Sequence, residues 1–215
     1  LRRPWLVIHH TWIVFPAQPM RRAMLAKLAV LPAALSICVS RALTRTLPVP
    51  AFVIPNACDT RLFQSADDPP RTHDLIFVGR LVSDKGADLL LRALGELRER
   101  GLSPRATIVG TGAEEPALRT LARDLRLEDV RFLGAQPAAE VARELRRHRV
   151  AVVPSRWQEP FGVVVLEALA CGCRVVASDA GGLPEAVGRC GLTFANGDVA
   201  ALAAALERGL AGDAP

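Results

Sequence analysis

The sequence has 215 residues, of which 50% are hydrophobic and 23% are charged, and this balance excludes a disordered or collagen-like chain. Its five cysteines are too few for a disulfide scaffold and include no C-x-x-C pair for zinc, so we expect reduced thiols and a cytoplasmic location. Residues 1–70 carry eight Lys or Arg and three Asp or Glu, so the whole net charge of +5 lies in this segment. We expect the segment either to face an anionic membrane surface or acidic acceptor, or to be ordinary solvated surface.

The first part of the chain predicts short strands separated by helices. Continuous apolar runs there are typical of strands that are buried on both faces. Ser40 is a suitable N-cap for the second helix. The elements expected are a strand over 4–8, a helix over 19–31, a strand over 35–39, a helix over 41–47 and a strand over 52–54.

Residues 56–71 are polar and proline-rich, which indicates a linker. We therefore divide the chain into residues 1–64, the C-terminal part of a first lobe with the linker, and residues 65–215, a second domain. The most apolar early stretch, residues 24–39, is too short for a membrane-spanning helix. The chain opens without Met on a strand-like run, so we expect it to lack its true N-terminus.

From residue 74 onward, apolar runs alternate with amphipathic stretches, which is typical of βαβ units and a parallel sheet. The fold class expected is therefore α/β, with a doubly wound parallel sheet in the second domain. Its ligands should bind at the carboxyl ends of the strands. The expected strands cover 75–78, 106–109, 130–133, 150–153 and 174–177, and the expected helices cover 86–100, 114–126, 138–147, 162–171 and 199–210, the last capped by Asp198.

Two loops at this carboxyl edge contain glycine. In the first, a strand ends at Gly79, Arg80 follows, and Lys85 comes just before a helix. Two cations at a helix start form an anion site, although a surface loop in an arginine-rich protein has the same composition. In the second, Gly110 and Gly112 flank Thr111, and they either approach a ligand with their backbone or only allow a tight turn.

A third loop, with the sequence Glu159-Pro-Phe-Gly162, precedes a helix that carries Glu167. The backbone N–H groups of Phe161, Gly162 and Val163 lie at that helix start, where a phosphate can receive them. Glu167 is the only charged residue in the apolar run 160–170. A solvated helix face is the common setting for such a residue, but apolar neighbours predict that a ligand hydroxyl pairs with it.

These motifs resemble the retaining glycosyltransferases of family 4, which have the GT-B fold. The resemblance rests on E-P-F-G-x-x-x-x-E-A with Glu159 and Glu167 in E-x7-E spacing, on Gly79-Arg-Leu-x-x-x-Lys-Gly86, and on Gly181-Gly-Leu-Pro-Glu185. Asn56-Ala-Cys-Asp59 resembles the family's linker motif I-P-N-G-x-D, with Ala57 where glycine is usual. The resemblance extends from Trp5 to about residue 211.

The resemblance implies two Rossmann-like domains, of which residues 1–64 are part of the acceptor-side lobe and residues 65–215 bind the nucleotide sugar. The implied activity is transfer of a sugar from a UDP- or GDP-sugar to an acceptor, with retention of anomeric configuration. The acceptor would be a glycan, a lipid-linked molecule or a small molecule. No metal or other cofactor is implied, because the cations and the helix start offset the charge of the leaving group.

The resemblance also assigns roles to individual residues. It places Glu159, Arg80, Lys85 and His10 in the catalytic group, with the two cations on the diphosphate and His10 near the sugar. It places the ribose on Glu167. The donor-binding group is Gly79, Gly110, Gly112, Phe161, Gly162, Val163 and Glu167.

Several alternatives remain open at this stage. Glu159 either contacts the transferred sugar in a front-face reaction or acts as a covalent nucleophile, as in glycosidases. The chain is an active transferase, a non-catalytic nucleotide-sugar-binding fragment or subunit, or a sugar-nucleotide epimerase of the same fold. Peripheral membrane contact is an expected interaction, whereas nucleic acid is not, because aromatic and basic residues do not interleave.

Overall fold

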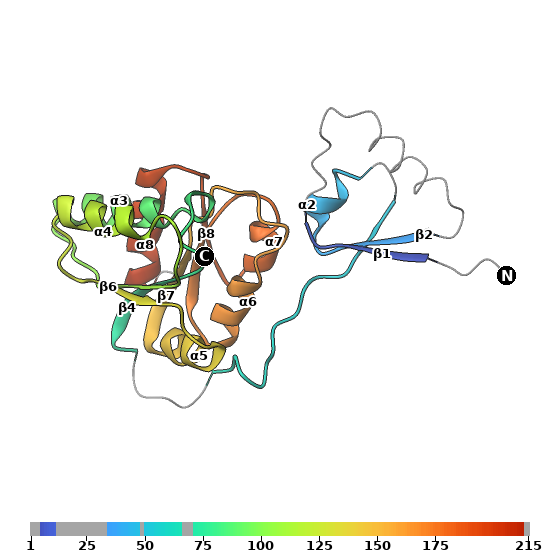
Figure 1. Ribbon diagram of the computed structural model, residues 1–215, viewed down its shortest axis with the longest axis horizontal. Helices are drawn as coiled ribbons and strands as arrows, with labels where there is room; N and C mark the ends of the chain where they lie inside the picture. The colour runs from blue at the N-terminus through green and yellow to red at the C-terminus, as the bar shows by residue number, and fades with distance from the viewer. Residues whose placement is uncertain (1–4, 12–33, 48–49, 66–70, 213–215) are drawn as a thin grey trace.

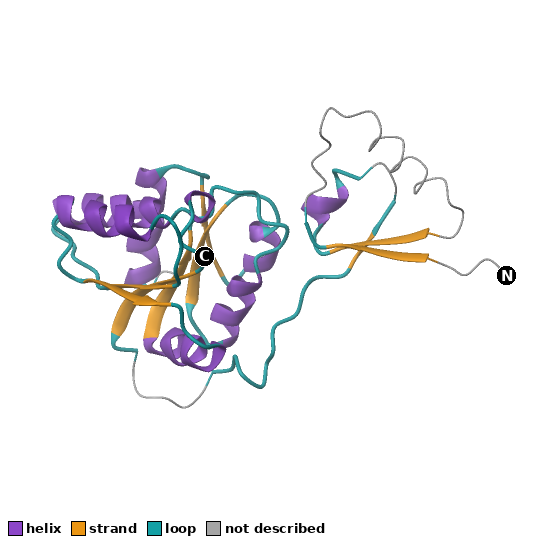
Figure 2. Ribbon diagram, in the orientation of Figure 1, coloured by secondary structure: helices purple, strands orange, loops and turns teal. Residues whose placement is uncertain are grey.

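The computed structural model describes residues 5–11, 34–47, 50–65 and 71–212. They form two separate parallel sheets, one of three strands and one of six (Figures 1 and 2). We call the part with the three-stranded sheet the N-terminal lobe and the part with the six-stranded sheet the C-terminal lobe. The predicted helix over 19–31 lies outside the described residues, and the predicted boundary between residues 64 and 65 stays a prediction.

The N-terminal lobe confirms the strands expected from the apolar runs. Its sheet has the order β1-β2-β3, and a short helix, α2, follows β2. The Ser40 hydroxyl accepts a hydrogen bond from the Leu43 amide at 3.1 Å, as predicted for an N-cap. The helix ends at Thr44, earlier than expected, and the amides of Thr46 and Leu47 instead form turn hydrogen bonds with the carbonyls of Leu43 and Thr44. The bounds are Trp5–His9 for β1, Ala34–Cys38 for β2, Arg41–Thr44 for α2 and Phe52–Val53 for β3.

The C-terminal lobe is a doubly wound sheet with the strand order β6-β5-β4-β7-β8-β9. All neighbouring strands in it are parallel, so their carboxyl ends share one edge. The α/β fold class with Rossmann-like parallel sheets is therefore confirmed. The strands are β4 (His73–Val78), β5 (Ala106–Val109), β6 (Val130–Gly134), β7 (His148–Val153), β8 (Arg174–Ser178) and β9 (Gly191–Phe194).

Helices cover both faces of this sheet (Figure 1). On one face α3 packs against α4 and α8, and on the other α6 packs against α5 and α7. The Asp198 carboxylate caps α8 by accepting from the Ala201 amide at 2.9 Å, as expected. The helices are η1 (Ser83–Lys85, a 3-10 turn), α3 (Ala87–Glu99), α4 (Glu115–Asp124), α5 (Ala138–Arg147), α6 (Val163–Ala170), α7 (Leu183–Val187) and α8 (Val199–Ala211).

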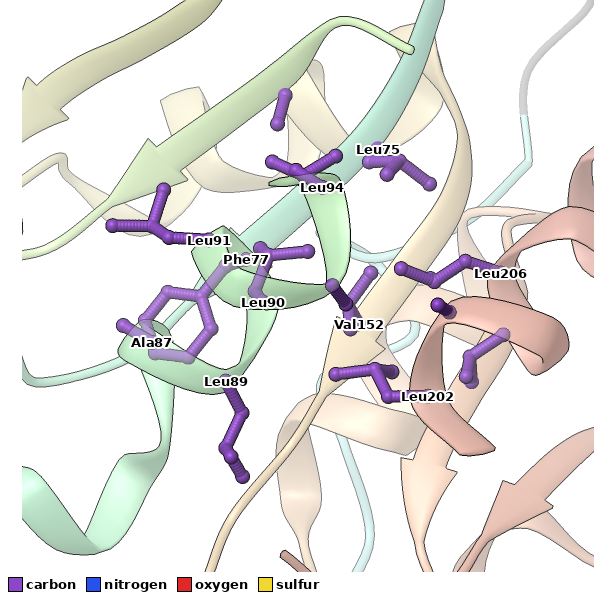
Figure 3. Packing of buried hydrophobic residues seen from close by; sticks show 14 of the residues in the cluster. Leu75, Phe77, Ala87, Leu89, Leu90, Leu91, Leu94, Val152, Leu202 and Leu206 are labelled. Atoms are coloured by element: carbon purple, nitrogen blue, oxygen red, sulfur yellow. The ribbon is translucent and has the colours of Figure 1, made fainter. Parts of the chain in front are cut away.

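The core follows the two-residue period of the strands. Leu75 and Phe77 of β4 point into a cluster with α3 and α8, whereas Ile76 between them belongs to the cluster on the opposite face. Figure 3 shows Leu90 of α3 and Leu206 of α8 gathered around this first cluster. Both faces of the sheet are thus buried, which explains why its strands read as continuous apolar runs.

The N-terminal sheet is buried less evenly. Leu6 and Ile8 of β1, Leu35 of β2 and Phe52 of β3 are exposed large apolar side chains, whereas Cys38 of β2 is fully buried. No helix among the described residues is long and apolar enough to cross a membrane. All five cysteines are free thiols, as expected.

A buried histidine joins β7 to its neighbours in the C-terminal lobe. The His148 side chain is fully buried. Its Nδ1 lies 2.6 Å from the Glu144 carbonyl oxygen, which only accepts, so Nδ1 carries the proton and Nε2 accepts from the Thr107 hydroxyl at 2.8 Å. Burial lowers the pKa of His148 to about 4, and the nearby Arg147 and His73 act in the same direction.

This burial predicts a pH dependence of stability. The pKa of His148 is lower in the folded chain than its usual 6.5, so the unfolded state takes up a proton first on acidification. The free energy of unfolding should therefore fall between pH 6.5 and about 4, by up to roughly 3 kcal/mol from this group. Urea denaturation across that range should show a shallower loss for His148→Asn than for the parent, and equal slopes would contradict the assignment.

Candidate functional site

The carboxyl edge of the six-stranded sheet contains a cavity of about 300 Å³. It lies between the loops that follow β4 and β7. The strands β5 and β6 lie on one side of β4, and β7, β8 and β9 lie on the other, so the strand order reverses at this point. Six of the predicted site residues line it, namely Gly79, Arg80, Lys85, Glu159, Gly162 and Val163. The structure therefore brings together residues that are up to 84 positions apart in the sequence.

A larger cavity of about 450 Å³ occupies the opposite edge of the sheet. It is lined by Ser103 and Pro104, which precede β5, and by Asp129, which precedes β6. Basic residues there, such as Arg98 and Arg126, stand beside Glu128 and Asp129, so the lining has no consistent charge. Ligands of parallel sheets bind at the carboxyl ends of the strands, and the chemistry of the smaller cavity makes it the candidate site.

An ion pair crosses the smaller cavity. Lys85 Nζ lies 2.5 Å from Glu159 Oε1, and the Ser155 hydroxyl donates to the same oxygen at 2.6 Å. The Glu159 side chain is 13% exposed and the Lys85 side chain 24% exposed, so both are largely shielded from water. The pair joins the loop after β4 to the loop after β7 and balances charge in the cavity.

Arg80 differs from Lys85 in its surroundings. Its side chain is exposed and has neither a hydrogen bond nor an ion pair with any other described residue. The guanidinium is therefore available to an anionic ligand at the mouth of the cavity.

The start of α6 forms the second side of the cavity. Gly162 has a φ of 95°, a left-handed conformation in which its ideal Cβ would lie 2.5 Å from a Leu183 methyl carbon. No side chain from the described part of the chain caps this helix, and its first residues, Val163 and Val164, line the cavity together with Gly162. First-turn N–H groups that have no partner within the helix are therefore available to a ligand there. Phe161 is buried in the apolar cluster below and does not line the cavity.

Gly110 and Gly112 lie next to the cavity but outside its lining. A Cβ on Gly110 would approach the Gly79 carbonyl oxygen to 1.9 Å, and one on Gly112 would approach the Leu81 oxygen to 2.2 Å. Their lack of a side chain lets the loop after β5 lie flat against the loop after β4. This packing is their role in the structure, and contact with a nucleotide stays a prediction.

Glu167 lies on α6, four residues beyond Val163, and is not among the residues that line the cavity. Its carboxylate is half-buried, and burial raises its pKa above the usual range. Among the described residues it has no hydrogen-bond or ion-pair partner, which is unfavourable for a half-buried carboxylate. A hydroxyl-bearing ligand would supply the missing donor.

His10 is exposed, one residue beyond the end of β1, and does not line the cavity. The preceding His9 is half-buried, its Nε2 has no partner among the described residues, and burial lowers its pKa. The structure thus places His10 in the other lobe from the cavity, and its contact with a sugar stays a prediction.

The sequence analysis overlooked Ser155, which belongs to the site, and Arg156, which follows it but does not line the cavity. Ser155 is buried, lines the cavity and orients Glu159, while its own carbonyl accepts from the Ser178 hydroxyl at 2.7 Å. Arg156 makes a two-pronged contact with Asp88 of α3 at 2.5 and 2.6 Å. Ser155 could have been found from the sequence, because it closely follows the apolar run of β7 at the carboxyl edge. The Arg156–Asp88 contact could not, because the two residues are 68 positions apart.

The described residues hold no group of three or more His, Cys, Asp or Glu side chains that could bind a metal ion. The cavity itself contains one carboxylate, which is already paired with Lys85. Its cations, hydroxyl and helix start are donors, and such a set suits an anion with a polar, uncharged extension.

Residues 72–211 match the family described as "Glycosyl transferases group 1". The chain is 42% identical to glycogen synthase of Mycobacterium tuberculosis over 160 residues, which is 72% of this chain and 38% of that protein. It is 44% identical to D-inositol 3-phosphate glycosyltransferase of Frankia alni over 146 residues, 62% of this chain and 36% of that protein. The chain thus spans less than two fifths of these curated relatives.

Solved structures share the architecture. The Anabaena protein HepE, in complex with UDP, superposes with a TM-score of 0.82 at 25% identity, covering 95% of this chain and 62% of that one. Sucrose-phosphate synthase of Thermosynechococcus elongatus superposes with a TM-score of 0.77 at 28% identity, covering 98% and 59%. The fold is therefore the Rossmann-like GT-B type that the resemblance implied.

The packing of Gly86 against Pro154 predicts how substitutions at glycine affect the contact between the loops after β4 and β7. Gly86 and Gly101 both have positive φ, but a Cβ on Gly86 would lie 2.0 Å from the Pro154 carbonyl oxygen, whereas one on Gly101 would meet nothing within 4 Å. Gly101→Ala should lower the free energy of unfolding by about 1 kcal/mol, from the left-handed conformation alone. Gly86→Ala should cost at least about 1 kcal/mol more, because the loops after β4 and β7 must separate. Equal costs in urea denaturation would show that these loops are not in contact.

Proposed function

The chain belongs to the group 1 glycosyl transferases, and from this membership we propose that the protein transfers a sugar from a UDP- or GDP-sugar to an acceptor with retention of anomeric configuration, as in family 4. The observation that carries the proposal is the cavity at the carboxyl edge, where Arg80, Lys85 and the uncapped start of α6 surround one carboxylate. HepE in complex with UDP and the curated glycosyltransferases support a nucleotide-sugar donor.

The cations take the diphosphate in this proposal. Arg80 is free of protein partners among the described residues and binds first, while Lys85 exchanges the Glu159 carboxylate for a phosphate oxygen. The N–H groups at the start of α6 add further donors. Together they stabilise the charge that develops on the leaving diphosphate, so no metal ion is required.

Glu159 and Glu167 take the neutral parts of the donor. Glu159, released from Lys85 and still held by Ser155, accepts from hydroxyls of the transferred sugar. Glu167 accepts from the ribose hydroxyls, which fits its half-buried, unpaired state in the described chain. His10 contacts the sugar from the N-terminal lobe, and Gly110 and Gly112 lie near the nucleotide.

Retention follows from a front-face reaction in this scheme. The anomeric bond to the diphosphate breaks, the sugar passes through an oxocarbenium-like state, and the acceptor oxygen attacks from the same face. The leaving phosphate takes the acceptor proton, so atoms and charges balance without a covalent enzyme intermediate. In this scheme the Glu159 carboxylate stays oriented by the Ser155 hydroxyl and accepts from sugar hydroxyls, rather than attacking the anomeric carbon.

The cation assignment predicts a selective loss of affinity. Lys85→Ala should weaken UDP roughly tenfold to a hundredfold, because a hydrogen bond to a charged group is lost, and should leave uridine unchanged. Calorimetry should give the same UDP affinity in EDTA and in Mg²⁺. Arg98→Ala, in the cavity at the opposite edge, is the matched control and should bind UDP like the parent. Equal UDP affinity for Lys85→Ala and the parent, or binding only with Mg²⁺, would contradict the assignment.

The ribose assignment predicts a different pattern. Glu167→Ala should weaken uridine, UMP and UDP alike by roughly tenfold, because all three carry the ribose. The exposed Glu99 at the end of α3 provides a control, and Glu99→Ala should have no effect on calorimetric affinity. If Glu167→Ala binds all three ligands as the parent does, the carboxylate does not contact the ribose. Nucleotide binding without sugar transfer would favour the non-catalytic alternative.

A further inference from the structure

The helix α2 in the N-terminal lobe has a start that is capped from the other lobe. The Arg41 amide donates to Glu185 Oε2 and the Ala42 amide donates to Glu185 Oε1, both at 2.8 Å. Glu185 belongs to α7, 144 residues further along the chain than Arg41. Figure 1 shows α2 and α7 facing each other between the two sheets.

The capping of α2 is divided between the two lobes. Ser40, which is fully buried, satisfies only the Leu43 amide, with its hydroxyl at 3.1 Å. The amides of Arg41 and Ala42 lie in the first turn, where backbone N–H groups have no hydrogen-bond acceptor within the helix. Both are satisfied by the single carboxylate of Glu185, so α2 has a complete cap only while the lobes hold this placement.

Apolar side chains accompany the polar contact. Val39 and Leu43 of the N-terminal lobe belong to the same buried cluster as Leu183 and Ala186 of α7. Glu185 itself is exposed, at the rim of this cluster. The Glu185 carboxylate, bonded to two backbone amides beside packed apolar side chains, fixes the distance between the two lobes and their relative orientation.

The same segment that carries Glu185 is fastened to the candidate site. The Gly182 amide donates to the Glu159 carbonyl oxygen at 2.7 Å. A Cβ on Gly181 would come within 2.3 Å of that oxygen, and one on Gly182 within 2.3 Å of the Pro160 oxygen. The start of α7 therefore lies against the backbone of the residue whose side chain pairs with Lys85.

We propose that Glu185 is a positioning residue that holds the N-terminal lobe onto α7, and thereby sets where that lobe stands over the donor cavity. Its carboxylate acts on α2, which follows the strand paired with β1, and β1 leads to His10. Glu185 contacts neither donor nor acceptor. Its catalytic consequence rests on the proposed function, whereas the contact between the lobes does not.

The experiment measures amide hydrogen exchange by NMR on the whole chain, for the parent, Glu185→Gln, Glu185→Ala and the control Glu99→Ala. Exchange at Arg41 and Ala42 should be roughly tenfold faster in Glu185→Ala, in line with loss of a helix cap, and intermediate in Glu185→Gln, which keeps one acceptor. Exchange at Leu43 should change less, because Ser40 caps it locally. The radius of gyration from small-angle scattering should rise in Glu185→Ala only.

Two outcomes of the exchange and scattering measurements would overturn the proposal, and a third concerns UDP affinity. One is exchange at Arg41 and Ala42 that is equal in Glu185→Ala and the parent. The other is faster exchange with an unchanged radius of gyration, since Glu185 would then be a local cap without an effect on the lobes. UDP affinity should stay within about twofold of the parent, because the cavity lies in the C-terminal lobe, and a loss as large as for Lys85→Ala would place Glu185 in the donor site instead. Failure of the parent to bind either UDP or GDP would refute the proposed function and leave the exchange test intact.

Discussion

The close approach of backbone to backbone at the carboxyl edge is the constraint on which the candidate site depends. Gly86 rests on the Pro154 carbonyl oxygen and Gly110 on that of Gly79, at distances that exclude any side chain. These contacts bring loops from separate strands close enough to share one cavity of about 300 Å³. The backbone positions from which Lys85 and Glu159 extend are thus set by close packing, which favours preorganisation of their ion pair.

The electrostatics of the cavity follow from this placement. Lys85 is held against Glu159, with Ser155 as a second donor, so the largely shielded carboxylate is never without partners. In the proposed function a phosphate would replace one anion by another at Lys85, and this exchange would avoid the cost of stripping water from an isolated cation. Arg80, exposed at the mouth, would add the charge that makes the exchange favourable for a doubly charged ligand.

The regular part of the fold was predictable because both faces of the large sheet are covered, so five of its six strands read as apolar runs. The strand Gly191–Phe194 was missed because it has four residues at the edge of the sheet, with Thr193 exposed. The helix over Leu183–Val187 has only five residues, which are too few to show a helical periodicity in the sequence. Within the site, glycines and cations stood out in the sequence, whereas the Arg156–Asp88 contact depends on a tertiary meeting that no local pattern records.

The divided cap of α2 determines what the N-terminal lobe of a relative would need in order to replace this one. The N-terminal lobe contributes backbone amides to the contact, and any residue other than proline offers the same group at positions 41 and 42. The C-terminal lobe contributes one carboxylate. For the polar half of this contact a foreign N-terminal lobe therefore needs only a short helix in the right place, whereas the apolar half still requires side chains that pack as Val39 and Leu43 do.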